Sequence, residues 1–443
     1  MLDPVLLRHA KTNTPRYTSF PTAPHFSDLT PDTYAHWLAD IPDDDAISLY
    51  LHIPYCRDMC WYCGCSTRAT RNTAPLERYA DLLEQEIRRV ANHVGRRQPV
   101  AHLHWGGGTP TYLPQPRLEA LSALLEAHFN ILPDAERAIE IDPRVCDETL
   151  VDSLAATGIN RASLGVQSFA PHVQKAINRV QDFETTQTCA KRLRERGIQS
   201  LSLDLLYGLP RQTLTDCRDT VLQALELDPD RLSVFGYAHV PQIRKHQNLI
   251  QADDLPSAEA RIEQAWLIAK TLENAGYVAI GIDHYARADD DMAIQLREGR
   301  LNRNFQGYTT DRAQTLIGLG ASAIGRLPRG FVQNTPDVAT WSRAIEQGQL
   351  ATARGHALDQ DDECRAAIIE RLMCDLEADL PALRARFGEL PEADLDDLVA
   401  DGIVQIDESA IRISPDYRML ARNVAARFDN RLGQGPARHS RSV

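Results

Sequence analysis

The sequence of 443 residues lacks several features that particular protein classes require. No apolar run approaches the roughly 20 residues that a membrane-spanning helix needs. Met1–Pro4 shows neither the basic region nor the long apolar stretch of a secretory signal. Positive charge is in deficit, because 48 Lys and Arg residues stand against 61 Asp and Glu residues, a net charge of −13. We therefore expect a cytoplasmic protein whose partners are neither nucleic acid nor membrane.

The rest of the composition is that of an ordinary globular chain, with 43% hydrophobic and 25% charged residues. Its length predicts two or three domains and a core that needs no disulfide. Nine cysteines are present, and four of them fall between positions 56 and 65. In a cytosolic chain this crowding indicates metal or redox chemistry. We expect buried structural thiols at the other five positions, Cys146, Cys189, Cys217, Cys364 and Cys374.

The pattern along the chain predicts three parts. Residues 1–45 are rich in Pro and Thr and form an N-terminal arm with one short helix near Tyr34–Leu38. Residues 46–330 repeat a strand–helix unit and form the catalytic domain. Residues 331–443 form a mostly helical, winged-helix-like domain with a hairpin in 403–413. That domain has no dense basic helix, so we expect it to cover substrate or pack against the catalytic domain.

Six strand–helix units at roughly 30-residue spacing indicate parallel strands joined by right-handed crossovers. The expected strands are Ser48–Ile53, Val100–His104, Ala138–Ile141, Ala162–Val166, Ser200–Leu206 and Leu232–Tyr237. The expected helices are Leu76–Asn92, Arg117–His128, Asp147–Thr157, Phe183–Arg196, Leu214–Glu226 and Ser257–Ala275. Six units are fewer than the eight of a closed barrel. The predicted fold is therefore α/β, a partial, open parallel (βα)6 barrel, with one strand more or less allowed.

A cysteine motif directly follows the first expected strand. Cys56, Cys60 and Cys63 have the spacing C-x3-C-x2-C, which lets thiolates from one loop converge on an iron–sulfur cluster. Three thiolates on a four-iron cluster leave one iron open for a ligand. A zinc site with the same thiolates and His52 or Cys65 is the alternative, although common zinc sites use paired C-x2-C spacings. Cys65 as a fourth ligand would close the site, so we leave it out of the ligand set.

A glycine-rich segment follows the second expected strand, as Gly106-Gly107-Gly108-Thr109. Glycines let the backbone approach another group closely. Alone this is a weak signal for a ligand site. One strand–helix unit after a cysteine loop, it becomes a strong one.

The cysteine spacing is the signature of the radical S-adenosylmethionine (SAM) superfamily. Within it, the chain resembles the oxygen-independent coproporphyrinogen III oxidases, or dehydrogenases, over nearly its whole length. The segments that carry this resemblance are Pro15–Ala23, Leu49–Pro54, Cys63–Cys65, Glu140–Arg144, Ser163–Phe169, Ile177–Arg179, Asp204–Pro210 and Arg303–Thr310.

The resemblance implies that Cys56, Cys60 and Cys63 hold one 4Fe-4S cluster, whose open iron binds the methionine part of SAM. Reduction would then cleave SAM to methionine and a 5′-deoxyadenosyl radical. A second SAM beside the first is implied as well, bordered by Phe305 and Gln306. The residues that the resemblance assigns to these cofactors are Tyr50, Tyr62, Gly64, Gly107, Gly108, Thr109, Glu140, Gln167, Arg179, Asp204, Ala238, Phe305, Gln306 and Ile324. For each polar one, a hydrogen-bonded structural role is the alternative.

The implied reaction converts two of the four propionates of coproporphyrinogen III to vinyl groups, giving protoporphyrinogen IX. A tetra-anionic substrate needs cationic hydrogen-bond donors. We expect Arg16 and Tyr17 to supply contacts if the arm covers the active site; the alternative is an exposed arm in which Arg16 caps a helix. A low-potential electron donor such as a flavodoxin or ferredoxin is the implied partner, and we expect a monomer.

Two other radical SAM functions are rivals. A related haem chaperone lacks the Cys-Gly-Cys ending and the Arg-Tyr-Thr-Ser arm, and both occur here, at 63–65 and 16–19. A haem-degrading methyltransferase is expected to lack much of the arm and the Asn-Phe-Gln-Gly-Tyr stretch at 304–308. One departure from the family pattern is the basic segment Tyr237–His246, where Arg244 and Lys245 either contact a carboxylate or face solvent.

Overall fold

A computed structural model describes residues 3–434 of the chain. Its centre is a 13-stranded sheet with the strand order β1-β17-β16-β15-β14-β2-β5-β6-β7-β8-β9-β11-β10. Seven consecutive strands of this order are parallel. They are β14 (Thr315–Leu319), β2 (Ile47–Ile53), β5 (Pro99–Gly107), β6 (Asn130–Ile141), β7 (Arg161–Gln167), β8 (Ser200–Tyr207) and β9 (Arg231–Gly236). Six of them confirm the predicted strands, and β14 is the additional one.

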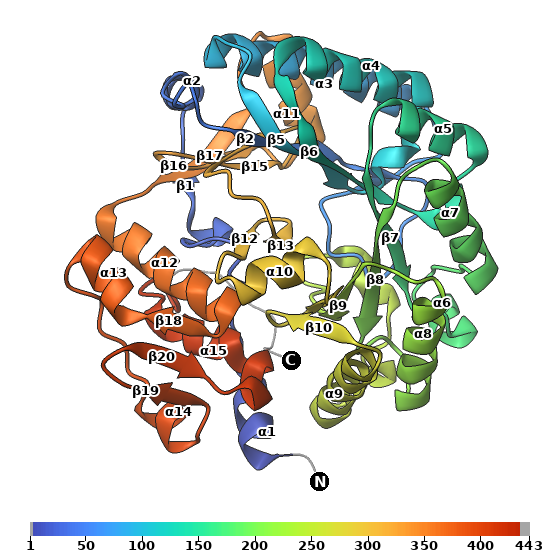
Figure 1. Ribbon diagram of the computed structural model, residues 1–443. Helices are drawn as coiled ribbons and strands as arrows, with labels where there is room; N and C mark the ends of the chain where they lie inside the picture. The colour runs from blue at the N-terminus through green and yellow to red at the C-terminus, as the bar shows by residue number, and fades with distance from the viewer. Residues whose placement is uncertain (1–2, 435–443) are drawn as a thin grey trace.

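The six predicted helices are also present and cover the outer face of these strands (Figure 1). They are α3 (Ala74–Val94), α4 (Gln115–His128), α5 (Glu148–Ala156), α7 (Phe183–Glu195), α8 (Leu214–Glu226) and α9 (Ala258–Asn274). In α3 the buried residues Leu83, Ile87 and Val90 recur every three or four positions, so one apolar stripe faces the sheet. Gly95, in the left-handed conformation (φ 76°), ends this helix.

Antiparallel strands extend the sheet at both edges. Beyond β14 lie β15 (Ile324–Leu327), β16 (Gly330–Asn334), β17 (Thr352–Ala357) and β1 (Ser27–Asp28); beyond β9 lie β11 (His284–Arg287) and β10 (Tyr277–Ile280). In the described part of the chain the edge strands β1 and β10 do not pair, so the barrel stays open, as predicted. Because parallel strands end at the same edge, their following loops share one side of the sheet.

The arm contains two helices, α1 (Pro4–Ala10) and α2 (Pro31–Ala39). The second confirms the expected helix, whereas α1 was missed although Asp3 before Pro4 is a helix-start signal: the Asp3 carboxylate accepts from the Val5 amide at 2.8 Å. Between them the arm is partly packed: Tyr17 and Phe20 are buried, whereas Arg16 is exposed. Arg303 donates to the carbonyl oxygens of residues 16 and 17, each at 3.1 Å.

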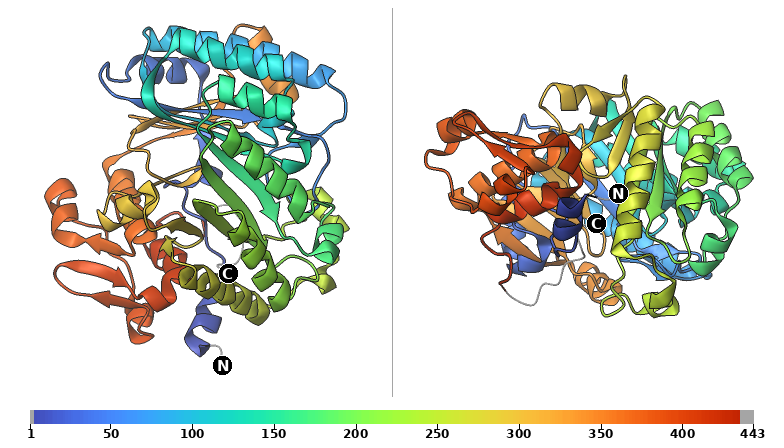
Figure 2. Two further views of the ribbon diagram at one scale, coloured as in Figure 1. Left: turned by 45° about the vertical axis from the view of Figure 1, so that its right-hand side comes forward. Right: turned by 90° about the horizontal axis from the view of Figure 1, so that it is seen from below.

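The C-terminal part has the order helix, strand, two helices and hairpin. Its elements are α12 (Gln360–Asp375), β18 (Glu377–Asp379), α13 (Leu380–Phe387), α14 (Asp396–Ala400), β19 (Val404–Ile406) and β20 (Ala410–Ile413). The three strands form an antiparallel sheet in the order β18-β20-β19, which includes the expected hairpin. Figure 2 shows this unit beside the large sheet, with α1 near both. The remaining elements are β3 (Tyr55–Cys56), β4 (Arg68–Ala69), α6 (Pro171–Ala176), α10 (Asp291–Arg297), β12 (Asn302–Asn304), β13 (Gly307–Thr309), α11 (Val338–Glu346) and α15 (Ala421–Ala425).

Two sequence expectations for this region are wrong in detail. The strand β16 spans residue 331, so the large sheet continues to Ala357 and the separate unit follows it. The single helix expected over 417–427 is broken into 3-10 turns on either side of α15, because Tyr417 (φ −107°) leaves helical geometry where its hydroxyl donates to Asp3 at 2.6 Å.

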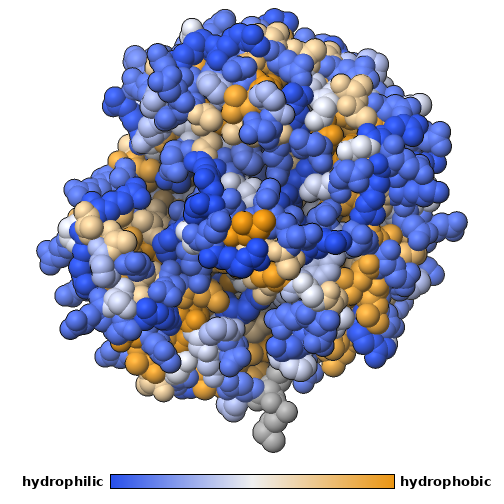
Figure 3. Space-filling model, in the orientation of Figure 1, coloured by the Kyte–Doolittle hydropathy of each residue, from blue (hydrophilic) through white to orange (hydrophobic). Residues whose placement is uncertain are grey.

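One continuous apolar core joins the sheet, its helices, the arm and the C-terminal unit. The five cysteines outside the cysteine loop are buried, as expected. Hydrophilic residues cover most of the face shown in Figure 3. No helix within residues 3–434 is both long and apolar enough to cross a membrane.

Candidate functional site

The cysteine loop lies at the carboxyl end of β2, on the side of the sheet where the parallel strands end. Its first two residues form β3, which pairs with β4 at the end of the loop. The loop is held from the opposite side by the turn after α6: the Trp61 amide donates to the Ile177 carbonyl at 2.9 Å, and the Asn178 side chain donates to the Met59 carbonyl at 2.9 Å. The loop therefore has a defined position at the mouth of the barrel.

Polar groups from the protein face two of the three predicted ligand sulfurs. Thr67 and Thr109 place their hydroxyls 3.2 and 3.5 Å from the Cys56 sulfur. Burial raises the pKa of the Cys56 thiol, and these hydroxyls oppose the rise. The Cys65 thiol donates to Cys63 and lowers the pKa of the Cys63 thiol to about 7, so its thiolate forms readily near neutral pH. The Cys65 amide nitrogen also lies 3.4 Å from the Cys63 sulfur.

The third sulfur, that of Cys60, faces two arginines. Arg179 Nη1 lies 3.6 Å and Arg144 Nη2 lies 3.8 Å from it. Both arginines also bind Asp142: Arg144 Nη2 at 2.6 Å and Arg179 Nη2 at 3.3 Å. Burial would raise the pKa of Asp142, but Arg179 and Arg144 outweigh it and keep that pKa below its ordinary value. This ion-pair network thus places positive charge beside the Cys60 sulfur.

These cysteines fit an iron–sulfur cluster. The negative charges of Cys60 and Cys63 raise the pKa of Cys56, so the three thiols lie within electrostatic reach of one another. Within residues 3–434, no three His, Cys, Asp or Glu side chains are close enough together to hold a single metal ion. Three cysteines on a four-iron cluster each bind a different iron, so the cluster does not require that arrangement. Hydrogen-bond donors to its sulfurs tune the potential of such a cluster.

The glycine segment after β5 packs directly against the cysteine loop. Gly107 has φ +117°, and a Cβ there would lie 2.8 Å from the ring of His52. A Cβ on Gly108 would lie 2.7 Å from the Tyr55 carbonyl oxygen. The Gly107 amide donates to the Glu140 carboxylate at 3.1 Å. The glycines are therefore needed for contact with protein atoms, a reason that the sequence alone did not indicate.

Predicted polar residues from three strands face the interior of the barrel. Tyr50 in β2 is hydrogen-bonded to His52 at 3.0 Å and stacks on His104 at 5.8 Å. In β8 the carboxylate of Asp204 accepts from the Ser163 hydroxyl at 3.1 Å. Burial and the negative charge of Glu140 raise the pKa of Asp204 to about 6. The structure thus brings Tyr50, Glu140 and Asp204 to one wall.

Two more predicted residues meet at β7: Gln167 ends this strand, and Arg179 reaches it from the turn after α6. Gln167 has φ +68°, a left-handed conformation that a residue with a side chain adopts only where its surroundings enforce it. Arg179, which faces Cys60, also donates to the Gly165 carbonyl at 2.6 Å. This places the amide group of Gln167 beside the buried arginine, because both side chains crowd the α-carbon of Gly165.

The basic segment after β9 braces the cysteine loop. Gln247 donates to the carbonyl oxygens of Tyr62 at 2.9 Å and Ala238 at 3.2 Å. His246 is hydrogen-bonded to the Cys63 carbonyl at 2.7 Å. Arg244 is one of the charges that lower the Cys63 pKa, so its charge acts on the site, whereas Lys245 is exposed.

The other predicted cofactor residues lie farther round the barrel. Ile324 begins β15, and its carbonyl packs on Gly318 of β14, the pairing partner of Tyr50. Phe305 and Gln306 form the turn between β12 and β13. Phe305 lines a cavity of about 870 Å³ between the arm and the C-terminal unit, and its ring lies 5.9 Å from that of Phe331. Gly64 lies in the cysteine loop with open space around its α-carbon.

The two arm residues have different surroundings. The Tyr17 hydroxyl donates to the buried Asp429 at 3.0 Å, and burial together with Asp429 raises the Tyr17 pKa far above its ordinary value. The phenol thus fastens the arm. Tyr17 also lines the cavity that Phe305 borders, and its contact with substrate stays a prediction. Arg16 is exposed and lies 5.7 Å above the Phe235 ring, with Nη2 3.4 Å from the Gly236 carbonyl.

The sequence reasoning gave no role to Asp142 and Arg144, although both lie in a segment that carries the family resemblance. The available signal was an acid, a proline and a base directly after a strand, at the edge where the cysteine loop was expected. His52, which the sequence offered only as a ligand of the alternative zinc site, fills the space beside Gly107: its second ring nitrogen is 2.9 Å from the Ser66 carbonyl, and burial lowers its pKa.

Comparison with known proteins agrees with this geometry. The family profile described as Radical SAM superfamily matches residues 50–224, so the class of protein that the open barrel and its cysteine loop define is a radical SAM enzyme. An oxygen-independent coproporphyrinogen III oxidase of Bradyrhizobium diazoefficiens is 50% identical over 437 residues, covering 97% of each chain. That of Pseudomonas aeruginosa is 40% identical over 442 residues, covering 97% of this chain and 96% of the other.

A solved structure gives the same answer. The coproporphyrinogen III oxidase from Escherichia coli, described as a radical SAM enzyme, superposes with a TM-score of 0.90 at 39% identity, covering 94% of this chain and 97% of that one. The chain belongs to the family of oxygen-independent coproporphyrinogen III oxidases.

Proposed function

We propose that this protein converts two propionate side chains of coproporphyrinogen III to vinyl groups without oxygen, giving protoporphyrinogen IX and carbon dioxide. The observation that carries the proposal is the cysteine loop at the carboxyl edge of an open barrel, with a protein donor facing each predicted ligand sulfur. Full-length similarity to oxidases named for this substrate supports the choice of reaction.

Cys56, Cys60 and Cys63 would hold one 4Fe-4S cluster, and Tyr50, Gly107–Thr109, Glu140, Gln167 and Asp204 would bind SAM beside it. When bound and reduced, this pair supplies a 5′-deoxyadenosyl radical, which is strong enough to remove a hydrogen atom from the propionate carbon next to the pyrrole. Arg179 and Arg144 place positive charge beside the Cys60 sulfur. Because opposite charges attract, this would stabilise a more negatively charged, reduced cluster.

The chain itself orients the substrate and limits water. The arm crosses from the large sheet to the C-terminal unit and is fastened there by Tyr17 and Asp429. That position puts the guanidinium of Arg16 at the carboxyl end of β9, where it can bind a propionate. Removal of this hydrogen atom leaves a radical on the propionate carbon, and the neighbouring pyrrole delocalises it. Loss of one further electron to an acceptor releases carbon dioxide and leaves the vinyl group.

The remaining parts of the proposal extend beyond the chain. We propose a second SAM bordered by Phe305, Gln306 and Ile324, a low-potential electron donor such as a flavodoxin or ferredoxin, and a monomeric enzyme of the cytoplasm. The three-part organisation of arm, catalytic domain and C-terminal unit is proposed as the functional one, with the catalytic sheet extended to Ala357.

An anaerobic assay tests the proposal. Reconstituted protein is mixed with SAM, coproporphyrinogen III, a low-potential reductant and cell extract as electron acceptor. Formation of protoporphyrinogen IX together with methionine and 5′-deoxyadenosine is the expected result. SAM cleavage without vinyl formation in this complete mixture would refute the proposed reaction and favour a haem-binding or haem-degrading role.

A further inference from the structure

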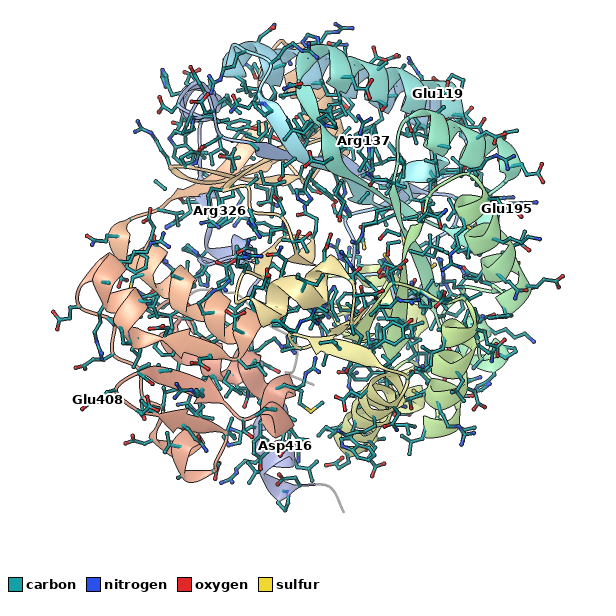
Figure 4. All side chains as sticks on the ribbon, viewed as in Figure 1. Glu119, Arg137, Glu195, Arg326, Glu408 and Asp416 are labelled. Atoms are coloured by element: carbon teal, nitrogen blue, oxygen red, sulfur yellow. The ribbon has the colours of Figure 1, made fainter. Side chains whose placement is uncertain are left out.

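A cavity of about 480 Å³ lies beside the carboxyl ends of β8 and β9, a size typical of small-molecule sites. Separate parts of the chain contribute to its wall: Arg16 from the arm, Arg261 from α9, and Arg418 and Arg422 from the C-terminal unit. Asp416, labelled in Figure 4, marks where the C-terminal segment approaches α1. Ala238, a predicted SAM residue, is also part of the wall, so the cavity adjoins the proposed active site.

The wall is cationic in a protein that is acidic overall. Five Lys and Arg side chains line it against three Asp and Glu side chains, whereas the whole chain carries −13. Two of the three acids have basic partners, Glu273 with Lys270 at 2.8 Å and Asp283 with His284 at 2.7 Å. Asp283 also lies within electrostatic reach of Arg16 and Arg422, so it offsets part of the positive charge of the four arginines.

Two of these arginines repel one another. Burial, and then the positive charge of Arg16, lowers the pKa of Arg422 to about 10. Like charges brought together at a buried position are unfavourable unless an anion lies between them. A carboxylate in the cavity would supply that anion and could accept hydrogen bonds from both guanidinium groups.

The other two arginines are held in place by backbone and rings. Arg261 Nη1 donates to the Tyr237 carbonyl at 2.8 Å, and a Cβ on Gly208 would lie only 2.7 Å from that nitrogen. Arg418 lies 5.4 Å above the Tyr285 ring. Its Nη2 donates to the Gly281 carbonyl, whereas its buried Nη1 has no hydrogen-bond partner among residues 3–434. A buried donor without a partner at a cavity wall is a place for a ligand acceptor.

We infer that this cavity, lined by Arg16, Arg261, Arg418 and Arg422 and here called the carboxylate cage, binds the propionates that the substrate retains. The inference rests on the proposed function. A propionate that reacts loses its charge as carbon dioxide, so a guanidinium that held it would stabilise substrate more than transition state. A retained propionate stays charged throughout, and its binding orients the ring without that cost. The cage therefore selects which side chains point away from SAM.

Substitution of Arg418 tests the cage. The variants are Arg418→Gln, Arg418→Lys and the control Arg412→Gln, whose arginine pairs with Asp407 on the surface of β20 at 2.7 Å. Affinity is measured on the anaerobic reconstituted enzyme by fluorescence titration with coproporphyrin III, the stable oxidised form of the substrate ring. Arg418→Gln is expected to weaken binding about tenfold or more, since a hydrogen bond to a charged group is lost. Arg418→Lys should lose less, and the control should match wild type.

The KM for coproporphyrinogen III is expected to rise by the same factor in Arg418→Gln. Equal affinity of this variant and wild type, or equal binding of the uncharged tetramethyl ester, would overturn the cage. If Arg418→Gln does not fold, Arg16→Gln, which changes an exposed residue, gives the same test. These outcomes are separate from the proposed function: a wild type that forms vinyl groups while the variants bind normally refutes the cage alone, and a wild type that forms none refutes the reaction.

Discussion

The ion pair between Arg179 and Asp142 offers a quantitative test of how the site is built. Arg179→Met removes the charge but keeps most of the volume. The lost contacts are two with the Asp142 carboxylate, at 3.3 and 3.4 Å, one with the Gly165 carbonyl at 2.6 Å and one with the Cys60 sulfur at 3.6 Å. Removing one partner of a buried pair costs about 3–5 kcal/mol. Because Arg144 still pairs with Asp142, we expect about 2–4 kcal/mol.

The assay is urea unfolding followed by circular dichroism, with Arg196→Met as control. Arg196 pairs with Asp152 at an exposed position, where loss is expected to cost less than about 1 kcal/mol. The pH dependence gives a second reading. The pKa of Asp142 is lowered, so its pair contributes stability above about pH 4 that is lost as the pH falls through the lower folded value. In Arg179→Met the stability lost on going to acid pH should be smaller than in wild type. A cost below 1 kcal/mol with an unchanged pH profile would refute the reasoning.

Three further predictions concern the site. Cys60→Ala is expected to abolish SAM cleavage. Cys65→Ala should retain the cluster, as read from its visible absorption, and shift the reduction potential of that cluster. A colourless Cys65→Ala protein would make Cys65 a ligand. Gly107 has φ +117°, and a new Cβ there would lie 2.8 Å from the His52 imidazole, so Gly107→Ala should lower the free energy of unfolding by about 2–3 kcal/mol. The uncrowded Gly197→Ala should lower it by about 1 kcal/mol. Thermal unfolding compares the two variants, and equal costs would contradict the clash. Asp204 has a pKa of about 6, and only its ionised form offers two acceptor oxygens and a negative charge to a ligand. SAM affinity measured by equilibrium binding should therefore fall below about pH 6 in wild type and lose that dependence in Asp204→Asn; an unchanged slope would assign it to another group.

Much of the barrel could be predicted from the sequence because its signal is local. Each parallel strand is a short apolar run followed by an amphipathic helix, and the start of a helix such as α8 carries its own capping pair, Thr213 and Asp216. The strands β14 to β16 were missed because they follow no such helix or join through short turns, and β17, although it follows α11, pairs antiparallel to β16. Their pairing depends on long-range contacts, such as that of Thr315 with Ile47.

The site, too, has a part that the sequence predicts and a part that it does not. The spacing of Cys56, Cys60 and Cys63 is enough to predict them as ligands. The partners of their sulfurs could not be predicted in this way, because Arg144 and Arg179 reach Cys60 only when the segment after β6 and the turn after α6 meet the cysteine loop. The anchoring of Tyr17 could not be predicted for a similar reason: its partner Asp429 is 412 positions away in the chain.

The most direct test of the central claim follows the hydrogen atom. Coproporphyrinogen III carrying deuterium on the propionate carbons next to the pyrroles is incubated anaerobically with the reconstituted enzyme, SAM, reductant and cell extract as electron acceptor. The proposed chemistry predicts that 5′-deoxyadenosine gains one deuterium for each vinyl group formed, as read by mass spectrometry. Vinyl formation with no deuterium in 5′-deoxyadenosine would contradict hydrogen abstraction by the SAM-derived radical.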